Sequence, residues 1–289
     1  MTWPPTEFGP ATPHASSSSI AHQLLAAARE LSEALAVLRF GSPIAHVYDP
    51  LQYAWAPYES YVARYGNSRK RVVLLGMNPG PFGMMQTGVP FGEVAAVRDW
   101  MGLHARVERP DSEHPRRPIE GFDCPRSEVS GRRLWGWAAL RFGAAPAFFR
   151  DWFVLNYCPL VFLEASGRNF TPDKLPAAQR KAVAQACDRH LAAALTALQP
   201  EWAIGVGAFA ERCLRTVLDS DRVGSTLARR VKVAQILHPS PASPAANRGW
   251  SDAVDRTLAQ LGVPLGAAEG AAAPSIRWEG FVDRPLPDA

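Results

Sequence analysis

Residues 71–76 read RVVLLG, one arginine followed by an apolar run, and this run decides the fold class. A continuous apolar run of this length is typical of a strand that is buried on both faces of a parallel sheet. Three more strand-length segments follow along the chain, at residues 153–157, 202–206 and 231–237. The sequence therefore predicts four strands of one mostly parallel sheet.

Segments with helical spacing of their apolar residues lie before, between and after these strands. They span residues 20–39, 58–65, 92–100, 127–142, 171–198 (after a Pro-flanked entry), 208–218 and 245–261. Strands that alternate with helices predict an α/β protein. The expected architecture is a three-layer α/β/α sandwich around a mostly parallel four-stranded sheet.

The two ends of the chain differ in composition from the part between them. Residues 1–19 are rich in Pro, Ser and Thr, residues 263–289 are rich in Ala, Gly and Pro, and neither end has an apolar period. Such segments cannot bury enough apolar surface to fold. We therefore expect one folded domain over residues 20–262, with a disordered N-terminal tail and a flexible C-terminal tail.

The chain is mildly basic, with a formal net charge of +4 and a pI of about 9.0. Eight of its arginines lie between residues 98 and 133, in and around a polar, Pro-rich stretch that is typical of a long surface loop. Such a cluster permits a polyanionic partner and equally suits an ordinary solvated surface. Charge alone leaves both interpretations open.

Other features exclude several classes of protein. No segment has the roughly 18 consecutive apolar residues of a membrane span, and the N-terminus lacks the basic and apolar regions of a secretory signal. The cysteines are widely spaced and form no CxxC pair, which argues against a zinc site or an iron–sulfur cluster. We expect an intracellular protein with reduced cysteines and no metal or cofactor.

The segments after the strands are informative, because open parallel sheets bind ligands at the carboxyl ends of their strands. MNPGPFGMMQTGVPFG follows the first strand at residues 77–92, and Asn156 lies at the end of the second. HPSP and NRGW follow the fourth strand at residues 238–241 and 247–250. Together they bring two amides, a histidine and aromatic rings to one edge, which is what a pocket for a nucleic-acid base needs.

Three segments, in this order, resemble the single-strand-selective monofunctional uracil-DNA glycosylase family, a branch of the uracil-DNA glycosylase superfamily. They are GMNPGPFGMMQTGVPFGEV at residues 76–94, NYCPL at 156–160, and HPSP with NRGW between 238 and 250. The likeness extends over about residues 46–262 and includes EVSGRRLWGW at 128–137. It implies a uracil-DNA glycosylase-like fold and a monofunctional DNA glycosylase of base excision repair, with DNA as its partner.

The resemblance implies a role for each matched residue. Asn78 would hold the attacking water, and His238 would stabilise the negative charge that develops on O2 of the departing uracil. Asn156 would read the amide edge of uracil, because a carboxamide can donate to a carbonyl oxygen and accept from a ring N–H. Phe91 would stack on the flipped base.

Gly80 stands where related glycosylases that exclude thymine carry a bulky side chain. A glycine leaves room beside C5 of the base, so uracils with a 5-substituent, such as 5-hydroxymethyluracil, are expected substrates. Met77 and Met84, together with Met85, are expected to line the same pocket.

The chemistry suits these residue types. Cleavage passes through an oxocarbenium-like sugar, in analogy with O-glycoside hydrolysis, while negative charge moves onto the base and must be stabilised there. Asn78 can orient a water but cannot deprotonate it, so we expect slower turnover than from a relative with aspartate there. The matching segments contain no nucleophilic lysine, so hydrolysis should leave an abasic site in an uncut strand.

The segment after His238 is expected to enter DNA beside the position that the flipped base vacates. The residues expected to contact DNA are Ser240, Pro241, Ala242, Ser243, Pro244 and Arg248. Ala242 stands where an arginine wedge is usual, which puts efficient opening of well-paired duplex in doubt. We expect a monomer that acts on single- and double-stranded DNA, in the bacterial cytoplasm on nucleoid DNA.

Each of these residues also has an ordinary structural interpretation. Asn78 can form an Asx turn before proline, Asn156 can cap a turn, and Phe91 can fill the core. Two other functions remain open: a catalytically silent damaged-DNA binder on the same fold, and a hydrolase of free nucleosides or nucleotides. Salt-insensitive substrate binding would favour that hydrolase, because phosphate contacts make DNA binding salt-dependent.

Overall fold

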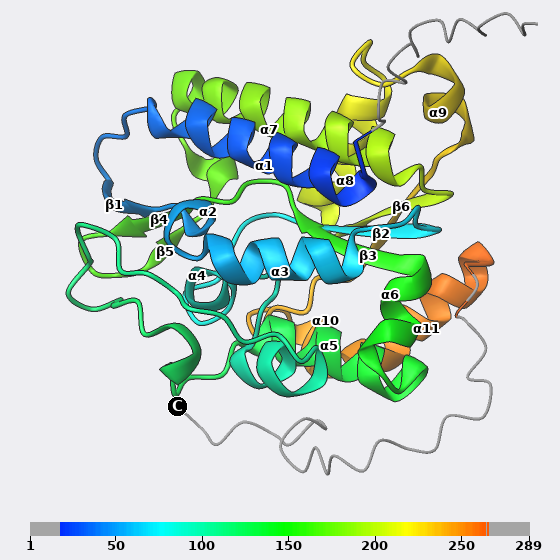
Figure 1. The fold of residues 1–289 in the computed structure, drawn as a ribbon, viewed down its shortest axis with the longest axis horizontal. Helices are drawn as coiled ribbons and strands as arrows, with labels where there is room; N and C mark the ends of the chain where they lie inside the picture. The colour runs from blue at the N-terminus through cyan, green and yellow to red at the C-terminus, as the bar shows by residue number, and fades with distance from the viewer. Residues whose placement is uncertain (1–17, 264, 266–289) are drawn as a thin grey trace, which may run out of the picture.

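In the computed structural model of the chain, residues 18–263 and residue 265 are described (Figure 1). Residues 1–17 of the expected N-terminal tail, and residues 264 and 266–289 of the expected C-terminal tail, lie outside the described residues. Val263 is buried and Leu265 packs against the core. Within the described residues, no helix is long and apolar enough to cross a membrane, and no group of three or more His, Cys, Asp or Glu side chains could hold a metal ion.

The longer helices follow the amphipathic segments of the sequence, whereas short helices at residues 50–53, 84–87, 145–151 and 225–230 were not predicted. The α-helices are α1 (Ile20–Ala36), α2 (Pro50–Tyr53), α3 (Trp55–Tyr65), α4 (Met84–Thr87), α5 (Val129–Phe142), α6 (Ala145–Asp151), α7 (Ala177–Leu198), α8 (Ala208–Leu218), α9 (Ser225–Arg230), α10 (Pro244–Asn247) and α11 (Trp250–Leu261). Single 3₁₀ turns form η2 (Gly121–Asp123) and η3 (Pro172–Lys174), and η1 (Ala96–Trp100) is a π-helix.

The predicted α/β/α sandwich is confirmed. Its sheet has the parallel order β3-β2-β6-β7, formed by β2 (Val72–Gly76), β3 (Trp152–Asn156), β6 (Trp202–Val206) and β7 (Lys232–Ile236). Helices α1, α7 and α8 lie on one side of this sheet, and α5, α10 and α11 lie on the other (Figure 1). Strands β2, β3 and β6 are buried along their whole length, which is why they lack the polar alternation of half-exposed strands.

Two of the predicted helices are interrupted. The segment 245–261 is not one helix but two, because Gly249 between α10 and α11 has a φ of 118°, far outside the helical range. The segment 92–100 makes a short α-helical start and continues as η1, where the N–H of Met101 bonds to the carbonyl oxygen of Ala96.

A second, antiparallel sheet has no counterpart in the sequence prediction. It contains β1 (Ile44–Tyr48), β4 (Val161–Glu164) and β5 (Asn169–Phe170), in the order β1-β4-β5. These strands are at most five residues long. Strands this short carry too little periodicity to be predicted, and β1 pairs with β4 more than 100 positions away. The sheet matters for function because β5 carries Asn169 to the candidate site.

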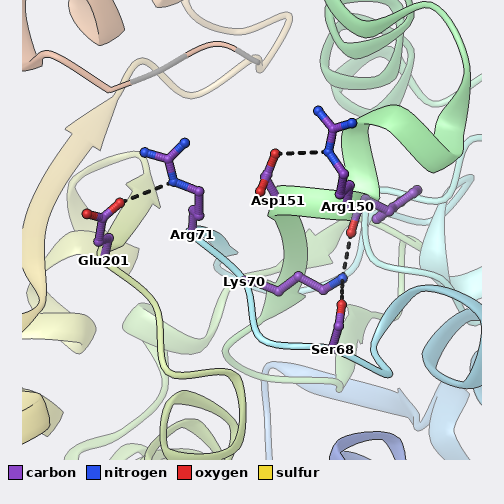
Figure 2. Close-up of polar contacts among 7 residues, drawn as sticks. Ser68, Lys70, Arg71, Arg150, Asp151 and Glu201 are labelled. Atoms are coloured by element: carbon purple, nitrogen blue, oxygen red, sulfur yellow. Dashed lines mark hydrogen bonds and ion pairs between the residues drawn. The ribbon is translucent and has the colours of Figure 1, made fainter. Parts of the chain in front are cut away.

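The amino ends of the main strands meet in a cluster of charged side chains (Figure 2). Lys70, two residues before β2, is only 3% exposed and donates to the carbonyl oxygen of Phe149 at 2.5 Å and to Ser68 Oγ at 3.0 Å. Burial lowers the pKa of the Lys70 ammonium group to about 8. Surface ion pairs lie around it, Arg71–Glu201 and Arg150–Asp151.

Candidate active site

A cavity of about 370 Å³ opens at the opposite edge of the main sheet, where the strands end. The predicted site residues that line it are Met77, Asn78, Gly80, Phe91, Asn156, His238 and Ser240. They come from the loops after β2 and β7 and from the end of β3. Parallel pairing of these strands therefore brings together residues that lie more than 150 positions apart in the sequence.

Asn78 follows β2, and one hydrogen bond sets the direction of its amide. Its Nδ2 donates at 3.2 Å to the carbonyl oxygen of Leu160, in the segment after β3. Because the donor side of the amide is occupied, Oδ1 is available as an acceptor in the cavity. Such an acceptor can hold and orient a water molecule but cannot act as a strong base.

Asn156 ends β3, and its amide is poorly satisfied within the protein. Its Oδ1 is buried and accepts no hydrogen bond from any described residue, while its Nδ2 meets only the sulfur of Met84, at 3.3 Å. A buried amide without partners is costly. A ligand edge with a carbonyl oxygen beside an N–H would satisfy both groups. Met84 lies behind Asn156 and is not part of the cavity wall.

Phe91 lies beside Asn156 in a strained backbone conformation, with a φ of 54° that residues other than glycine rarely adopt. Its carbonyl oxygen accepts from Trp135 Nε1 at 2.8 Å, and a Cβ on Gly131 would lie 2.0 Å from the same oxygen. A Cβ on Gly76 would lie 2.6 Å from the Phe91 ring and 2.4 Å from Asn156 Oδ1. Gly131 therefore leaves room for the backbone of Phe91, and Gly76 allows the ring and the amide to approach each other.

His238 follows β7, and its hydrogen bond indicates which ring nitrogen carries the proton. The N–H of Ser240 donates to His238 Nδ1 at 3.1 Å. Burial lowers the pKa of the His238 imidazole below its ordinary value of 6.5, so the ring is neutral at pH 7. Because Nδ1 accepts, the proton of the neutral ring lies on Nε2, which becomes a donor within the cavity.

The segment after His238 forms a turn at the rim of the cavity. Ser240 Oγ accepts from the N–H of Ala242 at 3.2 Å, and Ser243 Oγ caps α10. Only Ser240 of the residues expected to contact DNA reaches the cavity wall. The others lie outside it, and most are exposed: Pro241, Ala242, Pro244 and Arg248.

Arg133 of α5 supports this turn through hydrogen bonds. Its guanidinium donates to the carbonyl oxygens of Pro239 and Ser240 at 3.1 and 3.3 Å, and to Asn247 Oδ1 at 2.9 Å. This arginine of the basic cluster therefore has a structural part, which the sequence did not reveal because its partners lie more than 100 positions away. Two other arginines of the cluster form surface ion pairs, Arg98–Asp99 and Arg106–Glu108.

Glu128, at the start of α5, also lines the cavity and has no role in the sequence prediction. Its carboxyl oxygens accept from the N–H groups of Ser130 at 3.3 Å and Gly131 at 2.5 Å. Burial raises the pKa of this carboxyl group. A Cβ on Gly80 would lie 3.2 Å from Glu128 Oε1. A carboxylate directly before a helix was the available signal in the sequence.

Asn169 is another polar lining residue that the sequence prediction omits. It lies on β5, and its Nδ2 reaches the carbonyl oxygen of Pro79 at 3.5 Å. Its Oδ1 is buried and has no partner among the described residues. Nothing in the local sequence marks this residue, because the two-residue strand that carries it exists only through its pairing with β4.

Comparison with known proteins finds relatives along nearly the whole chain. Residues 63–261 match the family model of the Uracil DNA glycosylase superfamily. The single-strand selective monofunctional uracil-DNA glycosylase of Rattus norvegicus is 45% identical over 282 residues, which cover 95% of this chain and 98% of the relative. The single-strand selective monofunctional uracil DNA glycosylase of Bos taurus is 47% identical, over 87% of this chain and 90% of the relative. The crystal structure of wild-type Pedobacter heparinus SMUG2 superposes with a TM-score of 0.60 at 17% identity, over 85% of this chain and 98% of that one, and so shares the fold.

Proposed function

Because this chain belongs to the single-strand-selective monofunctional family of the uracil-DNA glycosylase superfamily, we propose that it hydrolyses the N-glycosidic bond of uracil in DNA and leaves an abasic site. The observation that carries the proposal is that Asn78, Asn156 and His238 meet in one cavity beside Phe91. The substrates include uracils with a 5-substituent, such as 5-hydroxymethyluracil, because residue 80 is glycine.

Binding begins when the base leaves the helical stack and enters the cavity. The flipped base stacks on the ring of Phe91. Asn156 accepts from N3–H through Oδ1, which has no partner among the described residues, and donates to O4 through Nδ2, which otherwise meets only the sulfur of Met84. Cytosine has an amino group at C4 and no proton on N3, so it presents the opposite pattern and is rejected.

Bond cleavage places negative charge on the base. As the C1′–N1 bond breaks, its electron pair leaves with uracil, and charge develops on O2. The Nε2–H of His238 donates to this oxygen. The donor is in place before the reaction, because the bond from Ser240 to Nδ1 fixes the neutral tautomer. Such preorganised donors contribute about 10²–10³ in rate.

Water completes the reaction at the sugar. Asn78 Oδ1 accepts from the water and directs its oxygen to C1′, and the proton that the water loses passes to solvent. None of the described residues that line the cavity is a lysine, so no amine of the wall competes with water for the sugar. The product is an abasic site in an intact strand.

The exposed turn after His238 contacts the DNA around the flipped nucleotide. Ser240–Pro244 and Arg248 supply these contacts. Ala242 brings neither bulk nor charge to the gap in the stack, so uracil in single-stranded DNA is excised faster than uracil in a well-paired duplex. Residues 20–262 act as one monomeric catalytic domain between two tails, in the bacterial cytoplasm where nucleoid DNA is accessible.

The decisive experiment incubates the full-length chain with matched single-stranded and duplex oligonucleotides that carry one uracil, without metal or cofactor, followed by alkali and gel separation. We expect alkali-dependent cleavage at the uracil, faster on the single strand. DNA binding without base release on either strand would favour the silent damaged-DNA binder. Activity on free nucleosides, with substrate binding that salt does not weaken, would favour the other hydrolase.

A further inference from the structure

The basic cluster, the eight arginines between residues 98 and 133, suits either a solvated surface or a polyanionic partner. The structure divides this cluster. Arg98 and Arg106 form ion pairs with acidic neighbours at 2.8 and 2.9 Å, and Arg133 supports the turn at the rim of the cavity. The protein therefore supplies partners for these three arginines.

Two other arginines of the cluster meet on one aromatic ring. The guanidinium carbon of Arg126 lies 4.2 Å from the ring centroid of Phe82, and that of Arg117 lies 5.4 Å from it. Within the described part of the chain, neither arginine forms an ion pair with an acid, and Nε of Arg117 is buried without a hydrogen-bond partner. Two like charges are thus held on one ring by cation–π contacts, without a counter-ion from those residues.

This pair of arginines lies directly outside the wall of the cavity. Phe82 follows Pro81, which lines the cavity, and Arg126 precedes Glu128, another lining residue, by two positions. The side chain of Phe82 is half-buried and that of Arg126 is exposed. The charges are therefore accessible to a partner that approaches the mouth of the cavity.

Hydrogen bonds fix the backbone that carries Arg117 to the same loop. Gln86 Nε2 donates to the carbonyl oxygens of Pro81 and Pro118, at 3.2 and 3.0 Å. The hydroxyl of Tyr48 donates to the carbonyl oxygen of Arg117 at 2.8 Å. The position of Arg117 relative to the cavity wall is therefore set by the fold.

We propose that Phe82, Arg117 and Arg126 form a second contact surface for DNA, on which the two guanidinium groups bind phosphates of the strand whose base occupies the cavity. This inference deepens the proposed function and rests on it, because the flipped base determines where the strand passes. The first surface, the turn after His238, comes from another segment of the chain. A phosphate is the counter-ion that both arginines lack, and a planar guanidinium group can bond it through two N–H groups. Phosphate contacts position a strand without reading its sequence.

The test measures affinity for DNA separately from excision. The full-length chain binds a labelled single-stranded oligonucleotide without uracil, and fluorescence anisotropy follows binding between about 50 and 200 mM salt. The double variant Arg117→Ala with Arg126→Ala should bind roughly tenfold or more weakly at the lower salt concentration. The slope of log affinity against log salt should become shallower by about 1.4, because each phosphate contact to a single strand contributes about 0.7.

The matched control is the double variant Arg98→Ala with Arg106→Ala, which removes the same formal charge from the same cluster. Both of these arginines are paired with acids, so the slope should not change. Equal losses of affinity in the two double variants would overturn the inference, because net charge alone would then explain binding. An unchanged slope for Arg117→Ala with Arg126→Ala would also overturn it, since no phosphate contact would have been lost.

The single variant Arg126→Ala keeps the test decisive if the double variant does not fold. The Arg126 side chain is exposed and donates no hydrogen bond to another described residue, so its loss should not disturb folding. We expect its slope to become shallower by about 0.7, and an unchanged slope would overturn the inference. Failure of the proposed function is seen separately: an unmodified protein that binds a uracil-containing strand without excising uracil contradicts that function, whatever the arginines do.

Discussion

The two edges of the main sheet use polar groups in opposite ways. At the amino edge, Lys70 is buried but donates to Phe149 and Ser68, and nearby charges form ion pairs (Figure 2). At the carboxyl edge, Asn156 Oδ1 is buried without a partner among the described residues, and Phe91 has a positive φ. Strand β2 joins both edges. Lys70 at the amino edge is satisfied by the protein, whereas Asn156 Oδ1 at the carboxyl edge is left for a ligand, at a cost in stability.

His238→Ala should have the largest effect. Loss of the Nε2–H donor should lower the single-turnover rate of uracil excision about 10²–10³-fold, because no donor then stabilises the negative charge on O2. DNA affinity, measured by fluorescence anisotropy, should stay within a few-fold, since the phosphate contacts remain. Activity that survives within a few-fold would remove His238 from the mechanism and weaken the contrast between the edges.

Gly76→Ala should come next. The added Cβ would lie 2.4 Å from Asn156 Oδ1 and 2.6 Å from the Phe91 ring, so both must move. We expect excision to fall more than tenfold. The matched control is Gly224→Ala, where a Cβ would meet nothing within 4 Å. Equal rates for the two variants would show that the approach of ring and amide is not needed.

The pH dependence of excision tests the neutral state of His238. Protonation would place a proton on Nδ1, which accepts from Ser240, and burial lowers the pKa of the ring below 6.5. The rate should therefore decline several-fold at acid pH, with a midpoint below pH 6.5. If the Glu128→Gln protein shows the same decline of rate at acid pH, the decline is assigned to His238. A midpoint at or above pH 6.5 would contradict the neutral-donor role.

Lys70 tests the amino edge by its effect on stability. Its pKa is about 8 in the folded chain and about 10.4 in an unfolded one. Between these values the unfolded chain binds more protons, so this residue makes stability rise with pH over that window. Lys70→Met should remove that rise, roughly 1–3 kcal/mol, in urea denaturation at pH 7.5, 9 and 10.5. Identical pH profiles for both proteins would show that Lys70 titrates normally.

Arg71→Ala should have the smallest effect. Arg71 and Glu201 are both about half exposed, so water already screens their pair. We expect the free energy of unfolding to change by less than about 0.5 kcal/mol and the excision rate not to change. A large loss of activity would show that the two edges are coupled through β2, against the separation proposed here.

Local sequence is sufficient to predict those elements whose own residues carry the whole pattern of apolar and polar positions. Apolar runs such as residues 72–76 predict buried strands, and the positions of Asn78 and His238 directly after strands predict that they share an edge. The helix break at Gly249 and the π-helix η1 after Ala95 were not predicted, because the amphipathic period continues through both. The antiparallel sheet was not predicted, since its strands are only two to five residues long and β1 pairs with β4 more than 100 positions away.

The sequence by itself determined the fold class, the family resemblance and many of the side chains that line the cavity, although Met84 and Met85, which it also predicted there, do not line it. Only the tertiary structure decided how the lining groups are presented to a ligand. Among the described residues, it sets the direction of the Asn78 amide, leaves Asn156 Oδ1 without a partner, places the proton of His238 on Nε2 and adds the carboxyl group of Glu128. The physical reason is that hydrogen-bond direction and desolvation depend on neighbours that parallel pairing brings together from distant parts of the chain.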